Sequence, residues 1–198
     1  MTRAYLAFTA KGLALAQKLA AAYPGSVTRC GHEAGQVHLA DWTARQFAGS
    51  DALVFVGVPF RNHAKLYNVA AVLNRGEIIG LVPKTYLPNY GEFYEQRHFA
   101  SGLGCLEYVD IEGKRVPFGT DILFICEEEP ELVAAAEICE DLWVTLPPSV
   151  LHAQAGANLI VNLSASNEMV GKDSYRRDLV SGPVSYTHLR AHETGAYL

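Results

Sequence analysis

The 198-residue sequence lacks any apolar run near the roughly 18 residues that a membrane-spanning helix requires. Its opening residues, MTRAYLAFTAKG, also lack the long apolar region and cleavage site of a secretory signal peptide. Positive charge is not in excess, because 16 Lys and Arg residues face 21 Asp and Glu residues and the net charge is -5. We therefore expect a cytoplasmic protein that has neither nucleic acid nor a membrane as its main partner, whereas small neutral or zwitterionic substrates remain open.

Signatures of metal sites and disulfide frameworks are missing as well. Four cysteines are present, but none has CxxC spacing and no paired histidines lie near them. His188 and His192 lie four residues apart, yet the HExxH order is absent and no third ligand is evident. We expect no metal site, and each thiol has to be judged singly against the common alternative of a small buried hydrophobe.

What the sequence does contain is a series of apolar runs separated by turn residues. Residues 52–60, ALVFVGVPF, predict a strand that is buried on both faces. Residues 65–87 predict a hairpin that turns at residues 74–77, and residues 104–126 predict a second hairpin. Residues 131–166 predict a strand, a helix and a strand. This order predicts an α/β layered domain whose function lies at strand ends and loops.

Cys139, in the stretch AAAEICEDLWV, is predicted to lie on the turn that leaves a buried strand. A substrate can reach a thiol there while neighbouring backbone N–H groups remain free to hold an oxyanion. A catalytic thiolate also needs a cation, and Lys84 at the end of EIIGLVPK is the candidate, with Glu92 and Glu95 in the loop behind it. The alternatives are a buried structural thiol, a solvated strand-end lysine and surface glutamates.

Three stretches carry a family resemblance. VPKTYLPNYGEFYEQRHFASG, AEICEDLWVTLPPS and ANLIVNLSASNEMVGKDSYRR, in this order, resemble the glutaminase domain of glutamine-dependent NAD+ synthetases, a branch of the nitrilase (carbon–nitrogen hydrolase) superfamily. The resemblance runs from about residue 53 to about residue 183. It implies an αββα sandwich that hydrolyses the side-chain amide of glutamine through a glutamyl thioester.

The resemblance also implies roles for individual residues. Cys139 would attack the amide carbon, Lys84 would stabilise the oxyanion, and Glu95 would position the catalytic groups. The residues implied to bind the substrate are Tyr90, Ser166 and Lys172. Glu140, beside the nucleophile, is expected either to contribute to the substrate pocket or to be an acid that leads a helix. No cofactor is implied for the glutaminase domain, and the ATP site of the synthetase domain, with its SGG-type loop, is absent from the sequence. In the parent family, glutamine hydrolysis is coupled to this ATP-dependent domain in an enzyme that is expected to be homo-oligomeric.

The two ends of the chain depart from this family. Residues 1–57, which predict a strand and helices, are similar to the N-terminal part of cobalt-precorrin hydrolase, a cobalamin-biosynthesis protein. Residues 184–198 look like a non-native tail, and residues 185–198 within it resemble translated adapter read-through. The family's general base lies in a stretch like FPELSLTGY, which this sequence lacks, and the only glutamate before residue 77 is Glu33. We therefore expect a partial nitrilase-like αββα sandwich, over residues 53–183, preceded by a short strand–helix α/β segment.

Three hypotheses for function follow. The first is a truncated glutaminase domain that supplies ammonia for NAD+ synthesis. The second is a catalytically inactive chimeric fragment, because the general-base glutamate and the synthetase domain are missing. The third places the function in residues 1–57. The sequence predicts that Lys84, Glu95 and Cys139 converge while the place of the first carboxylate stays empty, unless Glu33 or Asp41 reaches it.

Overall fold

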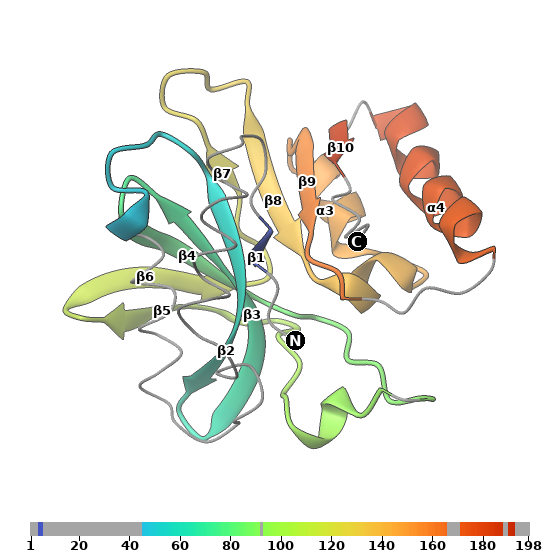
Figure 1. The fold of residues 1–198 in the computed structure, drawn as a ribbon, viewed down its shortest axis with the longest axis horizontal. Helices are drawn as coiled ribbons and strands as arrows, with labels where there is room; N and C mark the ends of the chain where they lie inside the picture. The colour runs from blue at the N-terminus through green and yellow to red at the C-terminus, as the bar shows by residue number, and fades with distance from the viewer. Residues whose placement is uncertain (1–3, 6–44, 92, 166–170, 188–189, 193–198) are drawn as a thin grey trace.

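A computed structural model describes residues 4–5, 45–91, 93–165, 171–187 and 190–192, and its ribbon forms two facing sheets with helices beside the second (Figure 1). Most of the strand and helices predicted within residues 1–50 lie outside the described residues. The predicted hairpins, and the later strand–helix–strand unit, are all present.

The first sheet has six strands in the order β1-β2-β3-β4-β6-β5. Four of them form two hairpins through the turns that the sequence predicts, at Arg75-Gly76 and Glu112-Gly113. A third hairpin, which turns at His63-Ala64, was not predicted, and His63 has a φ of 51° there. The bounds of the six strands are Ala4–Tyr5 for β1, Val54–Asn62 for β2, Lys65–Asn74 for β3, Glu77–Pro83 for β4, Leu106–Ile111 for β5 and Lys114–Gly119 for β6.

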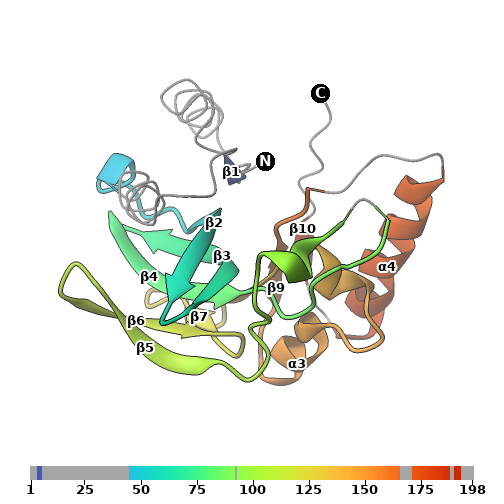
Figure 2. The same cartoon turned by 90° about the horizontal axis from the view of Figure 1, so that it is seen from below.

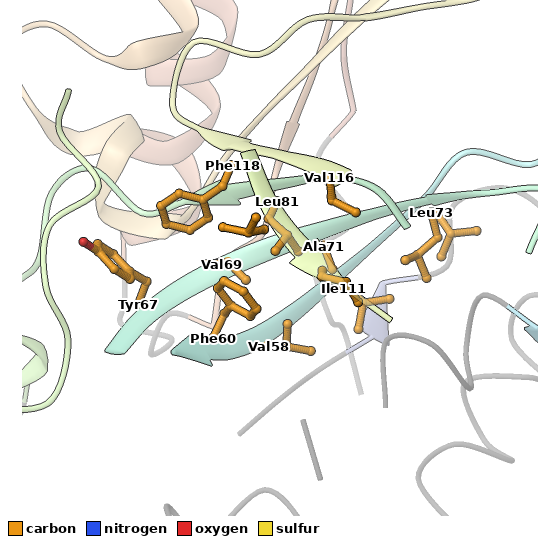
Figure 3. Close-up of a cluster of buried hydrophobic side chains, with 13 residues drawn as sticks. Val58, Phe60, Tyr67, Val69, Ala71, Leu73, Leu81, Ile111, Val116 and Phe118 are labelled. Atoms are coloured by element: carbon orange, nitrogen blue, oxygen red, sulfur yellow. The ribbon is translucent and has the colours of Figure 1, made fainter. Parts of the chain in front are cut away.

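The middle strands of this sheet are buried on both faces, as their continuous apolar runs predict. In β3, Val69, Ala71 and Leu73 face one cluster, whereas Ala70 and Val72 face another. The first cluster includes side chains from β5 and β6, which lie against those of β2 and β3 (Figure 3). At its centre Phe118 is fully buried, and its ring lies 5.8 Å from that of Phe60 and 5.1 Å from that of Tyr67.

The second sheet has four strands in the order β10-β9-β8-β7, and it pairs β8 with β9 in parallel. The strands are β7 (Phe124–Ile125), β8 (Val133–Glu137), β9 (Leu159–Asn162) and β10 (Arg190–His192). The crossover between β8 and β9 runs through α3 (Pro148–Gln154), and α4 (Lys172–Thr187) follows β9. Figure 2 shows the same arrangement from below. The helix α4 and the strand β10 thus extend past residue 183, where the sequence predicts the sandwich to end.

Alternation along β8 divides its residues between two layers. Ala134, Ala136 and Ile138 pack between the sheets, against Phe55 of β2 and other residues of the first sheet. Ala135 faces the other way and packs with residues on the α3 side. The result is a two-sheet sandwich with α3 and α4 beside the outer face of the second sheet (Figure 1), which agrees with the α/β layered prediction.

Glu137, the last residue of β8, is a buried anchor for α3. Its side chain is only 2% exposed. One carboxylate oxygen accepts the backbone N–H of Ser149 at 3.1 Å, and the other accepts the Asn162 side-chain amide at 3.0 Å. Burial raises the pKa of Glu137 above its ordinary value of 4.5, and the bonds from Asn162 and Ser149 oppose that rise.

The ring cluster around Phe118 generates a stability prediction. Phe118→Ala should lower the free energy of unfolding by about 3–5 kcal/mol, because it leaves a cavity between Phe60 and Tyr67. Tyr108→Ala, in the paired strand β5 but 61% exposed, should cost less than about 1 kcal/mol. Urea unfolding of both variants checks this, and equal losses would contradict the packing described for this face.

Glu137 generates a pH prediction. Because its folded pKa is raised, the folded protein binds more protons than the unfolded protein between pH 4.5 and the folded pKa. The stability of the wild type relative to Glu137→Gln should therefore increase as the pH falls from 7 toward 4.5. Urea unfolding across this range measures the difference, with exposed Glu131→Gln as the matched control. A difference that decreases with falling pH would refute the assignment.

Candidate active site

Cys139 lies where the chain turns sharply out of the second sheet. The strand β8 ends at Glu137, Ile138 is extended, and the 3-10 helix η2 (Cys139–Trp143) begins at the cysteine itself. Cys139 has a φ of 48°, which is the left-handed region that non-glycine residues seldom adopt. Its side chain is half-buried and packs at the edge of the cluster between the sheets. A half-buried cysteine with a strained backbone at a strand end is an arrangement that occurs at functional sites.

Lys84 lies at the end of β4 and is buried, with 1% of its side chain exposed. The alternative of a solvated strand-end lysine is therefore wrong. Its Nζ lies 2.6 Å from Oε2 of Glu95, the first residue of the 3-10 helix η1 (Glu95–Arg97). Its backbone is held on both sides, because its N–H donates to Asn68 and its carbonyl accepts from Gly102, each at 2.8 Å. The ion pair compensates the charge that burial would otherwise penalise.

Asp141 joins the Lys84 segment to the Cys139 turn, and the sequence analysis did not single it out. Its carboxylate accepts the backbone N–H of Thr85 at 3.1 Å and that of Tyr86 at 2.7 Å on Oδ1. Oδ2 accepts the N–H of Ile138 at 3.0 Å. Burial raises the pKa of Asp141 to about 6 although these bonds favour its ionised form. An acid three residues after the N-cap position of η2 is the signal that could have identified it.

Tyr90 and Glu140 meet beside this turn. The Tyr90 hydroxyl donates to the Glu140 carboxylate, with distances of 2.9 and 2.8 Å to its two oxygens. Both residues line an open hollow of about 690 Å³, whose wall also includes Gln96, Phe99 and Ser101. Glu140 follows Cys139 directly, so this hollow lies next to the turn that carries the thiol.

Of the two remaining candidates, Lys172 is among the described residues and Ser166 is not. Lys172, the first residue of α4, places its Nζ 5.4 Å from the centre of the Trp143 ring, at the end of η2. The same indole lies 5.6 Å from the ring of Tyr175. Ser166 lies outside the described residues, as does Glu92.

Glu33 and Asp41 lie outside the described residues, so the expected empty position of the first carboxylate stays a prediction.

Within the described part of the chain, no group of three or more His, Cys, Asp or Glu residues could hold a metal ion. None of the helices among those residues is long and apolar enough to cross a membrane.

The arrangement combines a strained thiol, a buried cation paired with a carboxylate, and an open hollow lined by residues that directly follow each of them in the chain. A thiol in this setting can attack an acyl carbon, and a buried ammonium can stabilise the oxyanion that forms. The two segments that carry Cys139 and Lys84 are bonded to one carboxylate. The geometry is therefore suited to acyl transfer.

Comparison with known proteins places these features in a family context. No protein-family model matches the chain. The chain is 46% identical over 125 residues to the glutamine-dependent NAD(+) synthetase of Mycobacterium tuberculosis, which covers 63% of this chain and 18% of that protein. It therefore spans about a fifth of the length of the curated relatives that it matches.

Solved structures give the same relationship. A glutamine-dependent NAD(+) synthetase from Cytophaga hutchinsonii matches with a TM-score of 0.67 and 28% identity, over 78% of this chain and 24% of that one. Saccharomyces cerevisiae Nit3, a member of branch 10 of the nitrilase superfamily, matches in fold with a TM-score of 0.56 and 16% identity, over 81% of this chain and 53% of that one. The chain is thus a homologue of glutamine-dependent NAD(+) synthetases over their nitrilase-like region, and its fold is that of the nitrilase superfamily.

Proposed function

We propose that this chain is a glutaminase module, which hydrolyses the side-chain amide of glutamine through a thioester on Cys139. The observation that carries the proposal is the ion pair of buried Lys84 with Glu95, together with the bonds that hold the segment after Lys84 to the Cys139 turn through Asp141. A solvated lysine and a core thiol would need none of these contacts. The homology with glutamine-dependent NAD(+) synthetases supports the choice of glutamine over other amides.

In the proposed reaction the Cys139 sulfur attacks the amide carbon, and its proton passes to a base. The tetrahedral oxyanion is stabilised by the Lys84 ammonium and by a backbone N–H at the turn. Collapse of this species breaks the carbon–nitrogen bond, and the leaving nitrogen takes up a proton and departs as ammonia. Water then cleaves the thioester, which releases glutamate and restores the thiol. Glu95 keeps the ammonium in place.

The substrate is proposed to lie in the hollow beside the turn. Its charged amino-acid end would be held by Tyr90, Glu140, Ser166 and Lys172. The Tyr90–Glu140 hydrogen bond places polar groups in the largely apolar wall of the hollow, and Lys172 brings a positive charge to the end of η2. A zwitterionic ligand requires both signs of charge, so Glu140 and Lys172 are proposed to favour glutamine over an uncharged amide.

The base decides between an active and an inactive module. The family resemblance implies a glutamate upstream of Lys84, and Glu33 is the only glutamate before residue 77. Loss of the general base lowers the reaction rate by roughly 10²- to 10⁴-fold. The inactive chimeric fragment is therefore the second candidate. For an active module, the ammonia is proposed to serve an ATP-dependent NAD+ synthetase domain like that of the relatives.

Labelling with a diazoketone analogue of glutamine tests the proposal. The diazo carbon should take up the proton that the thiol gives up, and the thiolate should then displace dinitrogen from that carbon and form a thioether at Cys139, from which glutamine should protect. Peptide mass spectrometry should find the label at Cys139 and not at Cys30, Cys105 or Cys126. Cys139→Ala should abolish labelling, whereas Cys126→Ala should retain it. Equal labelling of all four cysteines would sink the proposal.

Ammonia release distinguishes the two candidates. Release from glutamine by the wild type above the level of Cys139→Ala indicates an active module. Release that is indistinguishable from that control, together with selective labelling, favours the inactive fragment.

The buried ion pair generates a second prediction. Lys84→Met should lower Cys139-dependent ammonia release by about 10²- to 10³-fold, because the oxyanion loses a donor. Lys114→Met is the matched control, since Lys114 also pairs with a glutamate, Glu77, at 2.7 Å but is 62% exposed. Steady-state assays of both variants measure the effect. Similar rates for the two variants would remove Lys84 from the mechanism.

A further inference from the structure

We propose that Asp141 is a positioning residue, whose carboxylate holds the Lys84 segment and the Cys139 turn at a fixed separation. The inference rests on the proposed function and adds to it a residue that touches neither the substrate nor the reacting atoms. Its basis is that one buried side chain accepts a backbone N–H group from its own turn and two more from a segment that lies 55 and 56 residues away in the chain.

The bonded groups are next to the two catalytic candidates. Thr85 and Tyr86 directly follow Lys84, and Ile138 directly precedes Cys139. Oδ1 receives the first two N–H groups and Oδ2 receives the third. The carboxylate is rigid and planar, so a shift of either segment would stretch at least one bond to it. The separation of the ammonium and the thiol is therefore tied to the geometry of one group.

A local capping role does not account for these contacts. An acid in the first turn of η2 needs only the N–H of Ile138 to cap that turn. The bonds to Thr85 and Tyr86 reach the segment that follows β4 of the first sheet, and they are made by a side chain with 1% exposure. Removing a carboxylate from water is costly, and hydrogen bonds to a charged acceptor are the stronger kind that offsets this cost.

The strained backbone at Cys139 gives the tether a second effect. A non-glycine residue at a φ of 48° persists only when its surroundings determine that conformation. The bond from Ile138 to Asp141 fixes the residue just before the strained one, and Cys139 lies within the loop that this bond closes. Asp141 thus fixes both the turn and its distance from Lys84.

The test is Asp141→Asn, which keeps the shape of the side chain. Asparagine has one acceptor oxygen, so it can serve either Ile138 or the Thr85–Tyr86 pair, and its amide N–H group then meets the other donor. With the diazoketone analogue of glutamine, the maximal rate of Cys139 labelling should fall at least tenfold. The analogue concentration at half the maximal rate should change less than threefold. Asp110→Asn is the matched control, because Asp110 accepts the N–H of Gly113 at 3.0 Å in an exposed turn.

Rates are to be normalised to the folded fraction from the unfolding transition. Should Asp141→Asn fail to fold, Asp141→Glu replaces it, since it keeps both acceptor oxygens but lengthens the tether by one methylene. Its maximal rate should fall at least threefold with the same half-saturation. A folded variant with the wild-type maximal rate overturns the inference, as does an equal loss of rate and affinity. If the wild-type protein is not labelled selectively at Cys139, that result overturns the proposed function instead, and Asp141 then has no catalytic groups to position.

Discussion

The burial of three charged side chains is the constraint on which the rest of the structure depends. Lys84, Glu137 and Asp141 each have at most 2% of their surface exposed. A charge in the interior must be paired or hydrogen-bonded, or its desolvation outweighs what packing contributes. Each of the three meets this need with partners from a different part of the fold. The requirement therefore fixes how loops, strands and helices meet around the turn at Cys139.

The partners also explain the layered arrangement near that turn. Glu137 bonds to Ser149 and Asn162, so it connects β8 to α3 and β9 on one face of the second sheet. Asp141 bonds to the segment that follows β4 of the other sheet. Repulsion from Glu137 adds to the rise in the pKa of Asp141. Two carboxylates so close in the chain are both accommodated because backbone and amide N–H groups surround each of them.

The features of the fold that depend on local sequence could be predicted, whereas those that depend on contacts between distant residues could not. The turns at Arg75-Gly76 and Glu112-Gly113 have a glycine at positive φ, and this residue type predicts a turn from the sequence alone. The turn at His63-Ala64 has no glycine, and it was missed. Lys84 and Glu95 could be named as candidates from a strand end and a resemblance, but the burial of Lys84 is a tertiary fact. Asp141 was missed because two of its three donors lie 55 and 56 residues away.

These contacts separate the positioning of the catalytic groups from the transfer of the proton. Among the described residues, the groups bonded to the Lys84 and Cys139 segments lie between residues 68 and 141, from Asn68 and Gly102 on the lysine side to Ile138 and Asp141 on the other. Positioning of the thiol and of the ammonium is therefore local to this region. The proton acceptor is a separate requirement, because it acts on the rate of proton transfer and not on the geometry of the turn. A chain that keeps the positioning of the thiol and the ammonium but lacks the proton acceptor would still form a thioether with a reactive analogue, while it releases little ammonia from glutamine.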